Sequence, residues 1–132
     1  MSLITGGCLC GSVRYESTGV SSHPTLCHCS TCRRASGAHS LGWVTFPRAE
    51  FKFTADLPTE FRSSTPASRT FCAKCGTPLT FRHEKYPDDI DVTIGSLDAP
   101  GNVPPADHTW MSDAVAWDRP ADGLPQYPAN RV

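Results

Sequence analysis

The chain has 132 residues and a formal net charge of −1, because 12 Lys and Arg residues nearly balance 13 Asp and Glu residues. This balance offers no basic surface to a nucleic-acid backbone and no polybasic segment to an anionic membrane, so we expect neither partner. The length is typical of one domain, which we expect to span residues 1–132. The sequence has no signal-peptide pattern and no run approaching about 20 apolar residues, which favours a cytoplasmic protein.

Short stretches rich in β-branched and aromatic residues, bordered by turn residues, predict a mainly β fold. One short helix is expected after the middle of three cysteine clusters, with Ser30 as its N-cap and Gly37 at its end. From residue 98 the chain is rich in proline, and its spaced aromatic residues predict a segment that wraps over the sheet. The predicted strands are residues 12–17, 39–46, 50–55, 59–64, 68–73, 78–83 and 89–97.

Seven cysteines in a chain of this length suggest a role beyond packing. Their odd number and the expected reducing compartment argue against a disulfide framework. They fall into three clusters, which are Cys8-x-Cys10, Cys27-x-Cys29-x-x-Cys32 and Cys72-x-x-Cys75. Clustered thiols without disulfides favour metal binding.

The first and third clusters together suit one closed zinc site. Residues i and i+2 of a strand share a face, so Cys8 and Cys10 are expected to present both sulfurs to one point. Cys72-x-x-Cys75 followed by glycine has the form of a zinc knuckle, and four thiolates complete a tetrahedral structural site. A thioredoxin-type redox pair is the alternative for Cys72 and Cys75, but that motif belongs to a βαβ context that this sequence lacks.

The middle cluster then has three thiols and no fourth. Three protein ligands with an open position are typical of catalytic zinc, so Cys27, Cys29 and Cys32 predict a second, open zinc site and two zinc ions per chain. Closure by a histidine and the absence of a metal are the alternatives. His28 is a poor fourth ligand, because its side chain points away if its two neighbours face the metal. His39, His83 and His108 stay open as closing ligands.

The cysteine motifs and their surroundings resemble the family of glutathione-dependent formaldehyde-activating enzymes, which includes centromere protein V. The resemblance is carried by "GGCLCGSVRY" (6–15), "CHCSTCRRASG" (27–37) and "FCAKCGTPL" (71–79), and it extends over residues 92–98 and 108–128. It implies a zinc-stapled β-sheet fold of the β-tent type and two zinc sites divided as above. It also implies a carbon–sulfur lyase that handles S-hydroxymethylglutathione.

By this resemblance, Cys27, Cys29 and Cys32 would be the catalytic ligands, and glutathione or a similar thiol would be the partner at the open position. Arg33 and Arg34 would then bind a glutathione carboxylate or stay solvated. We expect one of the three tryptophans, Trp43, Trp110 and Trp117, to line the site. A non-enzymatic, zinc-stabilised interaction module is the alternative function.

Overall fold

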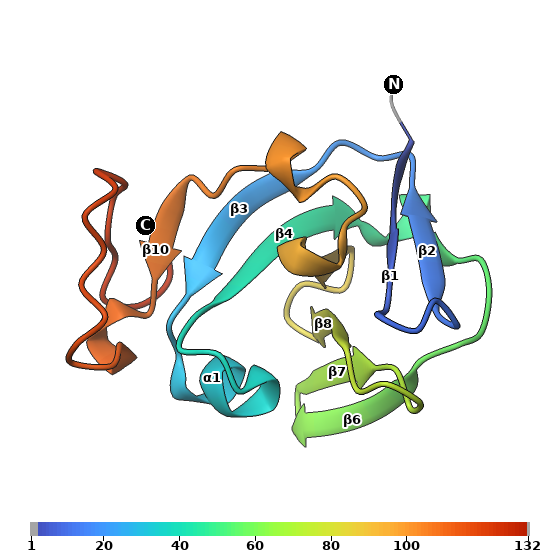
Figure 1. The fold of residues 1–132 in the computed structure, drawn as a ribbon, viewed down its shortest axis with the longest axis horizontal. Coiled ribbons are helices and arrows are strands. Elements are labelled where there is room, and N and C mark those ends of the chain that lie inside the picture. The colour runs from blue at the N-terminus through green and yellow to red at the C-terminus, as the bar shows by residue number, and fades with distance from the viewer. Residues whose placement is uncertain (1–2, 132) are drawn as a thin grey trace.

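The computed structural model describes residues 3–131 and confirms a mainly β fold built from two sheets. The smaller sheet has the strand order β1-β2-β5, and the larger has the order β10-β3-β4-β9-β8-β7-β6 (Figure 1). The strands are β1 (Ile4–Gly7), β2 (Arg14–Ser17), β3 (Ser22–Cys27), β4 (Leu41–Pro47), β5 (Phe51–Phe53), β6 (Thr59–Ser64), β7 (Ala67–Phe71), β8 (Pro78–His83), β9 (Asp89–Thr93) and β10 (Asp107–Thr109). The helices are α1 (Ser30–Ser36) and the 3-10 turns η1 (Arg48–Glu50), η2 (Ile94–Ser96), η3 (Pro100–Asn102) and η4 (Met111–Asp113).

One face of the larger sheet forms the hydrophobic core. Val44 on β4 lies opposite Val92 on β9, and Phe46 lies opposite Ile90. These side chains are at most 5% exposed and pack with Tyr15 of the smaller sheet. Because side chains alternate along a strand, burying this face directs the intervening residues to the other side.

The opposite face of the larger sheet carries a row of polar and aromatic side chains. Residues directly opposite each other on neighbouring strands share a face, so the register identifies this row. It contains Thr25, Trp43, Thr45, Asp91, Phe81 and Arg69, from β3, β4, β9, β8 and β7. This face, rather than the core face, bears the candidate site.

The strand predictions hold for most of the chain, with errors where the pattern was weak. The strands predicted at 59–64 and 78–83 have those bounds, but the one predicted at 89–97 ends at Thr93, where η2 begins. The predicted stretches 12–17, 39–46, 50–55 and 68–73 differ from β2, β4, β5 and β7 by a few residues. Three strands were not predicted: glycines weaken the pattern of β1, Pro24 and a register shift interrupt β3, and β10 is very short.

The helix ends where it was expected to end but starts one residue earlier than predicted. Gly37 is its C-cap, in the left-handed conformation with φ 74°. The N-cap is Cys29 rather than Ser30, because Cys29 keeps an extended backbone and its sulfur accepts a hydrogen bond from the Cys32 N–H at 3.2 Å. A cysteine of the middle cluster therefore also fixes the start of α1.

The C-terminal segment meets the prediction in part: Val103 packs into the core of the larger sheet, whereas the segment from β10 onward extends the edge of this sheet. β10 pairs in parallel with β3, and the chain returns beside it (Figure 1). Tyr127 donates its N–H to His108 O at 2.9 Å, and Trp110 donates to Ala129 O at 3.0 Å. Backbone hydrogen bonds, which sequence patterns of aromatic residues do not reveal, set this position. No helix within residues 3–131 is both long and apolar enough to cross a membrane.

Candidate metal centres

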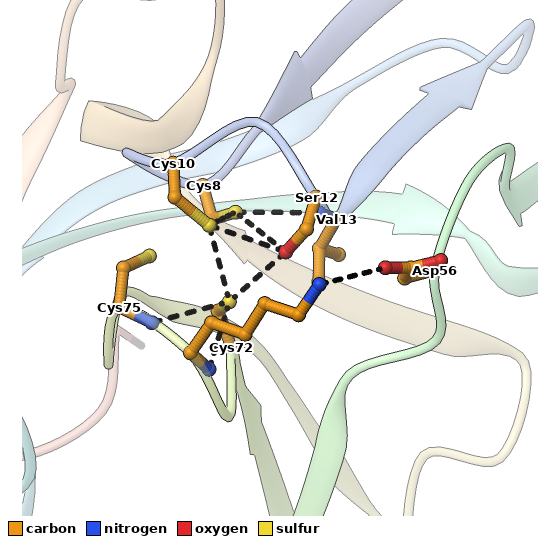
Figure 2. Close-up of polar contacts among 8 residues, drawn as sticks. Cys8, Cys10, Ser12, Val13, Asp56, Cys72 and Cys75 are labelled. Atoms are coloured by element: carbon orange, nitrogen blue, oxygen red, sulfur yellow. Dashed lines mark hydrogen bonds and ion pairs between the residues drawn. The ribbon is translucent and has the colours of Figure 1, made fainter.

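The first and third cysteine clusters meet in space, although more than sixty residues separate them in sequence. The sulfur atoms of Cys8, Cys10, Cys72 and Cys75 all lie within 4.8 Å of one another. The Cys8 sulfur lies 3.6 Å from that of Cys10, and the Cys10 sulfur lies 3.8 Å from that of Cys72 (Figure 2). All seven cysteines are free thiols, so the sulfurs gather without a disulfide. Four sulfurs this close could hold one metal ion.

Two similar turns bring these sulfurs together. Cys8 and Cys10 lie in the turn between β1 and β2, not on a strand, which corrects the sequence prediction. The Gly11 N–H bonds to Cys8 O at 3.1 Å, and the Gly76 N–H bonds to Cys72 O at 2.8 Å. Both glycines have a positive φ, 81° and 82°, which other residues adopt only with strain. The second turn is the knuckle that the sequence predicted.

Hydrogen-bond donors around this cluster favour negative charge on two of its sulfurs, those of Cys8 and Cys75. Burial raises the pKa of Cys8, but hydrogen bonds outweigh this effect and lower the pKa to about 7. The strongest of these hydrogen bonds comes from the Val13 N–H. Hydrogen bonds from the side chain and backbone of Thr77 lower the pKa of Cys75 to about 5. The hydroxyl of Ser12 also points among the sulfurs, and its oxygen lies 3.2 Å from the Cys10 sulfur (Figure 2). Thiolates are the form of cysteine that binds metals, so the surroundings fit a metal site.

The middle cluster gathers at one end of the larger sheet. Cys27 is the last residue of β3, Cys29 caps α1 and Cys32 lies in its first turn. Their three sulfurs lie within 4.8 Å of one another. The sequence spacing therefore brings the three thiols together as predicted, and they too could hold a metal ion.

The positively charged side chain of Arg69, on a strand distant in the sequence, contacts a sulfur of the middle cluster. Arg69 on β7 donates from Nη2 to Cys32 Sγ at 3.6 Å. Its guanidinium lies over the Phe81 ring at 4.9 Å and near the Trp43 ring at 5.9 Å. Hydrogen bonds from Cys27 and then Cys29, with the charge of Arg69, lower the pKa of Cys32 to about 2. Hydrogen bonds with Cys29 and then Cys32, together with burial, raise the pKa of Cys27. The group thus favours shared negative charge, centred on Cys32.

No further His, Cys, Asp or Glu within residues 3–131 brings a ligand atom into the middle group. His28 is 1% exposed and is not part of the group, and its Nε2 lies 3.0 Å from His108 Nδ1. His108 Nε2 is also 2.8 Å from Asp122. His39 contacts Asp118, and His83 accepts a hydrogen bond from the Lys85 backbone. Each histidine considered as a closing ligand therefore has another contact.

A cavity of about 600 Å³ opens over the middle cluster. Its volume lies in the range of small-molecule sites, and Cys27, Cys29 and Cys32 all line it. Two tryptophans line it, Trp43 and Trp110, rather than the one expected. Trp117 is 71% exposed and packs against His39.

An adjoining cavity of about 550 Å³ shares Thr31, Trp43, Ser63 and Arg69 with the first. Arg34 lines this second cavity, whereas Arg33 lines none of those described. Of the two arginines that follow the middle cluster, Arg34 is therefore the one placed to meet a ligand.

Sequence reasoning missed the charged residues of this cavity, among them Arg69 and Asp91. Both lie inside predicted strands, at positions that alternate with apolar residues. The alternation marks them as lying off the core face, but only the pairing of β7, β8 and β9 brings them to the cysteines.

Comparisons with known proteins show the family to which this sequence is similar. The sequence profile of the family described as "Glutathione-dependent formaldehyde-activating enzyme" matches residues 3–113. A Halomonas elongata protein that carries the provisional name of such an enzyme is 27% identical over 126 residues, covering 87% of this chain and 79% of the relative. An uncharacterized lyase of Schizosaccharomyces pombe is 29% identical over 85 residues, covering 59% of this chain and 56% of the relative.

The fold also matches a solved structure. A crystal structure of a Rhodobacter sphaeroides protein superposes with a TM-score of 0.62 at 20% identity, covering 93% of this chain and 98% of that one. At this level of identity the match shows a shared fold.

Proposed function

The chain belongs to the glutathione-dependent formaldehyde-activating enzyme family, and we propose that it is a cytoplasmic carbon–sulfur lyase acting on S-hydroxymethylglutathione or a similar thiol adduct. One observation carries this proposal. Three cysteine sulfurs, with no fourth ligand among the described residues, face a cavity of about 600 Å³. A purely structural metal site would be closed by its own protein ligands.

We assign a zinc ion to each cysteine group, because donor sets made of cysteine alone favour this metal. Cys8, Cys10, Cys72 and Cys75 would hold the closed, structural ion. Cys27, Cys29 and Cys32 would hold the second ion, whose remaining position faces the cavity. When bound there, zinc lowers the pKa of an incoming thiol and so supplies a thiolate at neutral pH.

The residues of the cavity would bind and orient the substrate. Trp43 and Phe81 offer apolar walls, while Arg34 in the adjoining cavity offers a forked donor to a substrate carboxylate. In the direction of synthesis, the thiolate sulfur bonds to the carbonyl carbon of formaldehyde, and the carbonyl oxygen gains negative charge. Arg69 would donate hydrogen bonds to that oxygen, since its guanidinium already lies beside Cys32 in the cavity.

NMR exchange spectroscopy tests the function directly. The adduct forms without a catalyst, so the relevant quantity is the rate of exchange between glutathione with formaldehyde and S-hydroxymethylglutathione. Catalytic amounts of the zinc-loaded protein should accelerate this exchange, and calorimetry should show glutathione binding. Binding without acceleration would contradict the lyase and favour the interaction module.

A further inference from the structure

Asp91 is a carboxylate on the cavity face of the larger sheet, at the centre of strand β9. It lies opposite Thr45 on one side and Phe81 on the other. Its Oδ1 accepts a hydrogen bond from the Thr45 hydroxyl at 2.6 Å. Its Oδ2 has no hydrogen-bond partner within residues 3–131. Thr45 therefore fixes the carboxyl group and leaves one oxygen free.

The same side chain lines two cavities. It borders the cavity of about 600 Å³ that contains the middle cysteines and an adjoining one of about 330 Å³. Burial, and to a smaller extent the negative charges of Asp89 and Cys32, raises the pKa of Asp91 from its ordinary value to about 6, although the Thr45 hydrogen bond opposes this rise. A carboxyl group with such a pKa exchanges protons near neutral pH.

The other acidic residue lining the larger cavity, among the described residues, is less suited to exchange protons. Asp113 is exposed, and its carboxylate accepts from the Ser30 N–H at the start of α1 at 3.5 Å. Asp113 therefore lacks the burial of Asp91, and its carboxylate contacts the start of α1. The charged and titratable groups that surround Asp91 are Asp89 on its own strand, His23 on β3, Cys32 on α1, Arg69 on β7, Arg82 and His83 on β8, and Lys85, Tyr86 and Arg131 around the cavities.

We propose that Asp91 is the proton donor and acceptor for the hydroxyl group of the thiol adduct. This inference rests on the proposed function and adds a catalytic residue to it. In synthesis the thiolate sulfur bonds to the formaldehyde carbon, the π electrons of the carbonyl move to oxygen, and this oxygen takes the proton of Asp91.

The reverse reaction balances in the same way. The Asp91 carboxylate takes the hydroxyl proton, the carbon–oxygen double bond forms, and the carbon–sulfur bond breaks to release the thiolate. The proton of the free thiol is exchanged with solvent, as is that of Asp91. Nothing is oxidised or reduced, so no further reactant is required.

The Asp91→Asn variant tests this role in the zinc-loaded protein. General acid catalysis is worth about 10²- to 10⁴-fold, and we expect the exchange rate to fall by this factor. Zinc content and glutathione affinity should stay unchanged. Asp89→Asn is the matched control, because Asp89 lies two residues away on the same strand and face but does not line the larger cavity. It should keep the catalytic step, and its pH inflection should move only slightly to lower pH, because one negative charge near Asp91 is lost.

The pH profile separates proton transfer from a structural effect. Synthesis requires protonated Asp91, so the wild-type rate should fall as the pH rises through about 6. Asp91→Asn should lack this inflection. Thr45→Val removes a hydrogen bond that favours the charged carboxylate, so the inflection should move to higher pH.

An Asp91→Asn variant with the wild-type rate and pH profile would overturn the role of Asp91 while leaving the lyase intact. Should Asp91→Asn not fold, an unmoved inflection in Thr45→Val would overturn it equally. A wild-type protein that does not accelerate exchange would overturn the lyase, and the role of Asp91 with it.

Discussion

Replacing Asp91 by Asn should make the stability of the protein less dependent on pH. Burial of this carboxyl group raises its pKa in the folded state from 3.8 to about 6. The unfolded chain has the ordinary value, so the folded state loses stability relative to the unfolded state as the pH rises through about 6. At about 1.36 kcal/mol per pH unit, the full loss is on the order of 3 kcal/mol. Asn has no such ionisation, and its packing effect does not vary with pH.

About half of this loss, roughly 1.5 kcal/mol, falls between about pH 5 and pH 8. Over that window the free energy of unfolding of Asp91→Asn should therefore increase relative to the wild-type value by this amount. Urea unfolding of both proteins, at a series of pH values and a fixed excess of Zn²⁺, measures it. The excess metal makes the contribution of the zinc sites common to both proteins. A difference that is constant with pH would refute the proposed ionisation of Asp91. A difference that shrinks as the pH rises would mean that folding lowers the pKa of Asp91 instead of raising it.

Four further variants probe the two metal centres and the cavity. Cys72→Ser should unfold the protein, because a structural zinc is worth about 10 kcal/mol or more against a domain stability of about 5–15 kcal/mol, whereas Cys32→Ser should lose one zinc and stay folded by circular dichroism. The opposite pattern would mean that the structural and reactive sites are reversed. Arg69→Leu should slow adduct exchange by about 10²-fold at unchanged zinc content, and a wild-type rate would exclude Arg69 from stabilising the oxygen. His108→Phe leaves the buried Nε2 of His28 unpaired, at a cost of about 1–3 kcal/mol. Because His28 lies between Cys27 and Cys29 in the sequence, this change should weaken binding of the second zinc but not of the first, as measured by competition with a chelator.

The sequence predicted the cysteine groups well, because their chemistry depends on spacing over a few residues. Cys27, Cys29 and Cys32 needed only a strand end and one helical turn to meet. The pairing of the first cluster with the third was predicted because a structural zinc site takes four ligands and each of these clusters supplies two. The local backbone was less predictable: Cys8 and Cys10 meet through a turn, although the spacing i, i+2 also fits a strand.

The rest of the candidate site could not be read from the sequence, since it depends on strand order. Asp91 and Arg69 are 22 positions apart in the sequence, and neither lies near a cysteine motif of the middle cluster. The order β9-β8-β7 brings them to one face through their shared neighbour Phe81. Alternation along each strand shows which residues leave the core, but long-range pairing decides what they meet.

The open position at the middle cysteines is the central claim, and thiolate-to-metal absorption tests it most directly. Co²⁺ is placed at the middle site while Zn²⁺ stays at the first, and glutathione is then added. The charge-transfer absorption should rise by about a third, as a fourth thiolate joins the three from Cys27, Cys29 and Cys32. A spectrum that already shows four protein ligands and does not change with glutathione would contradict the claim.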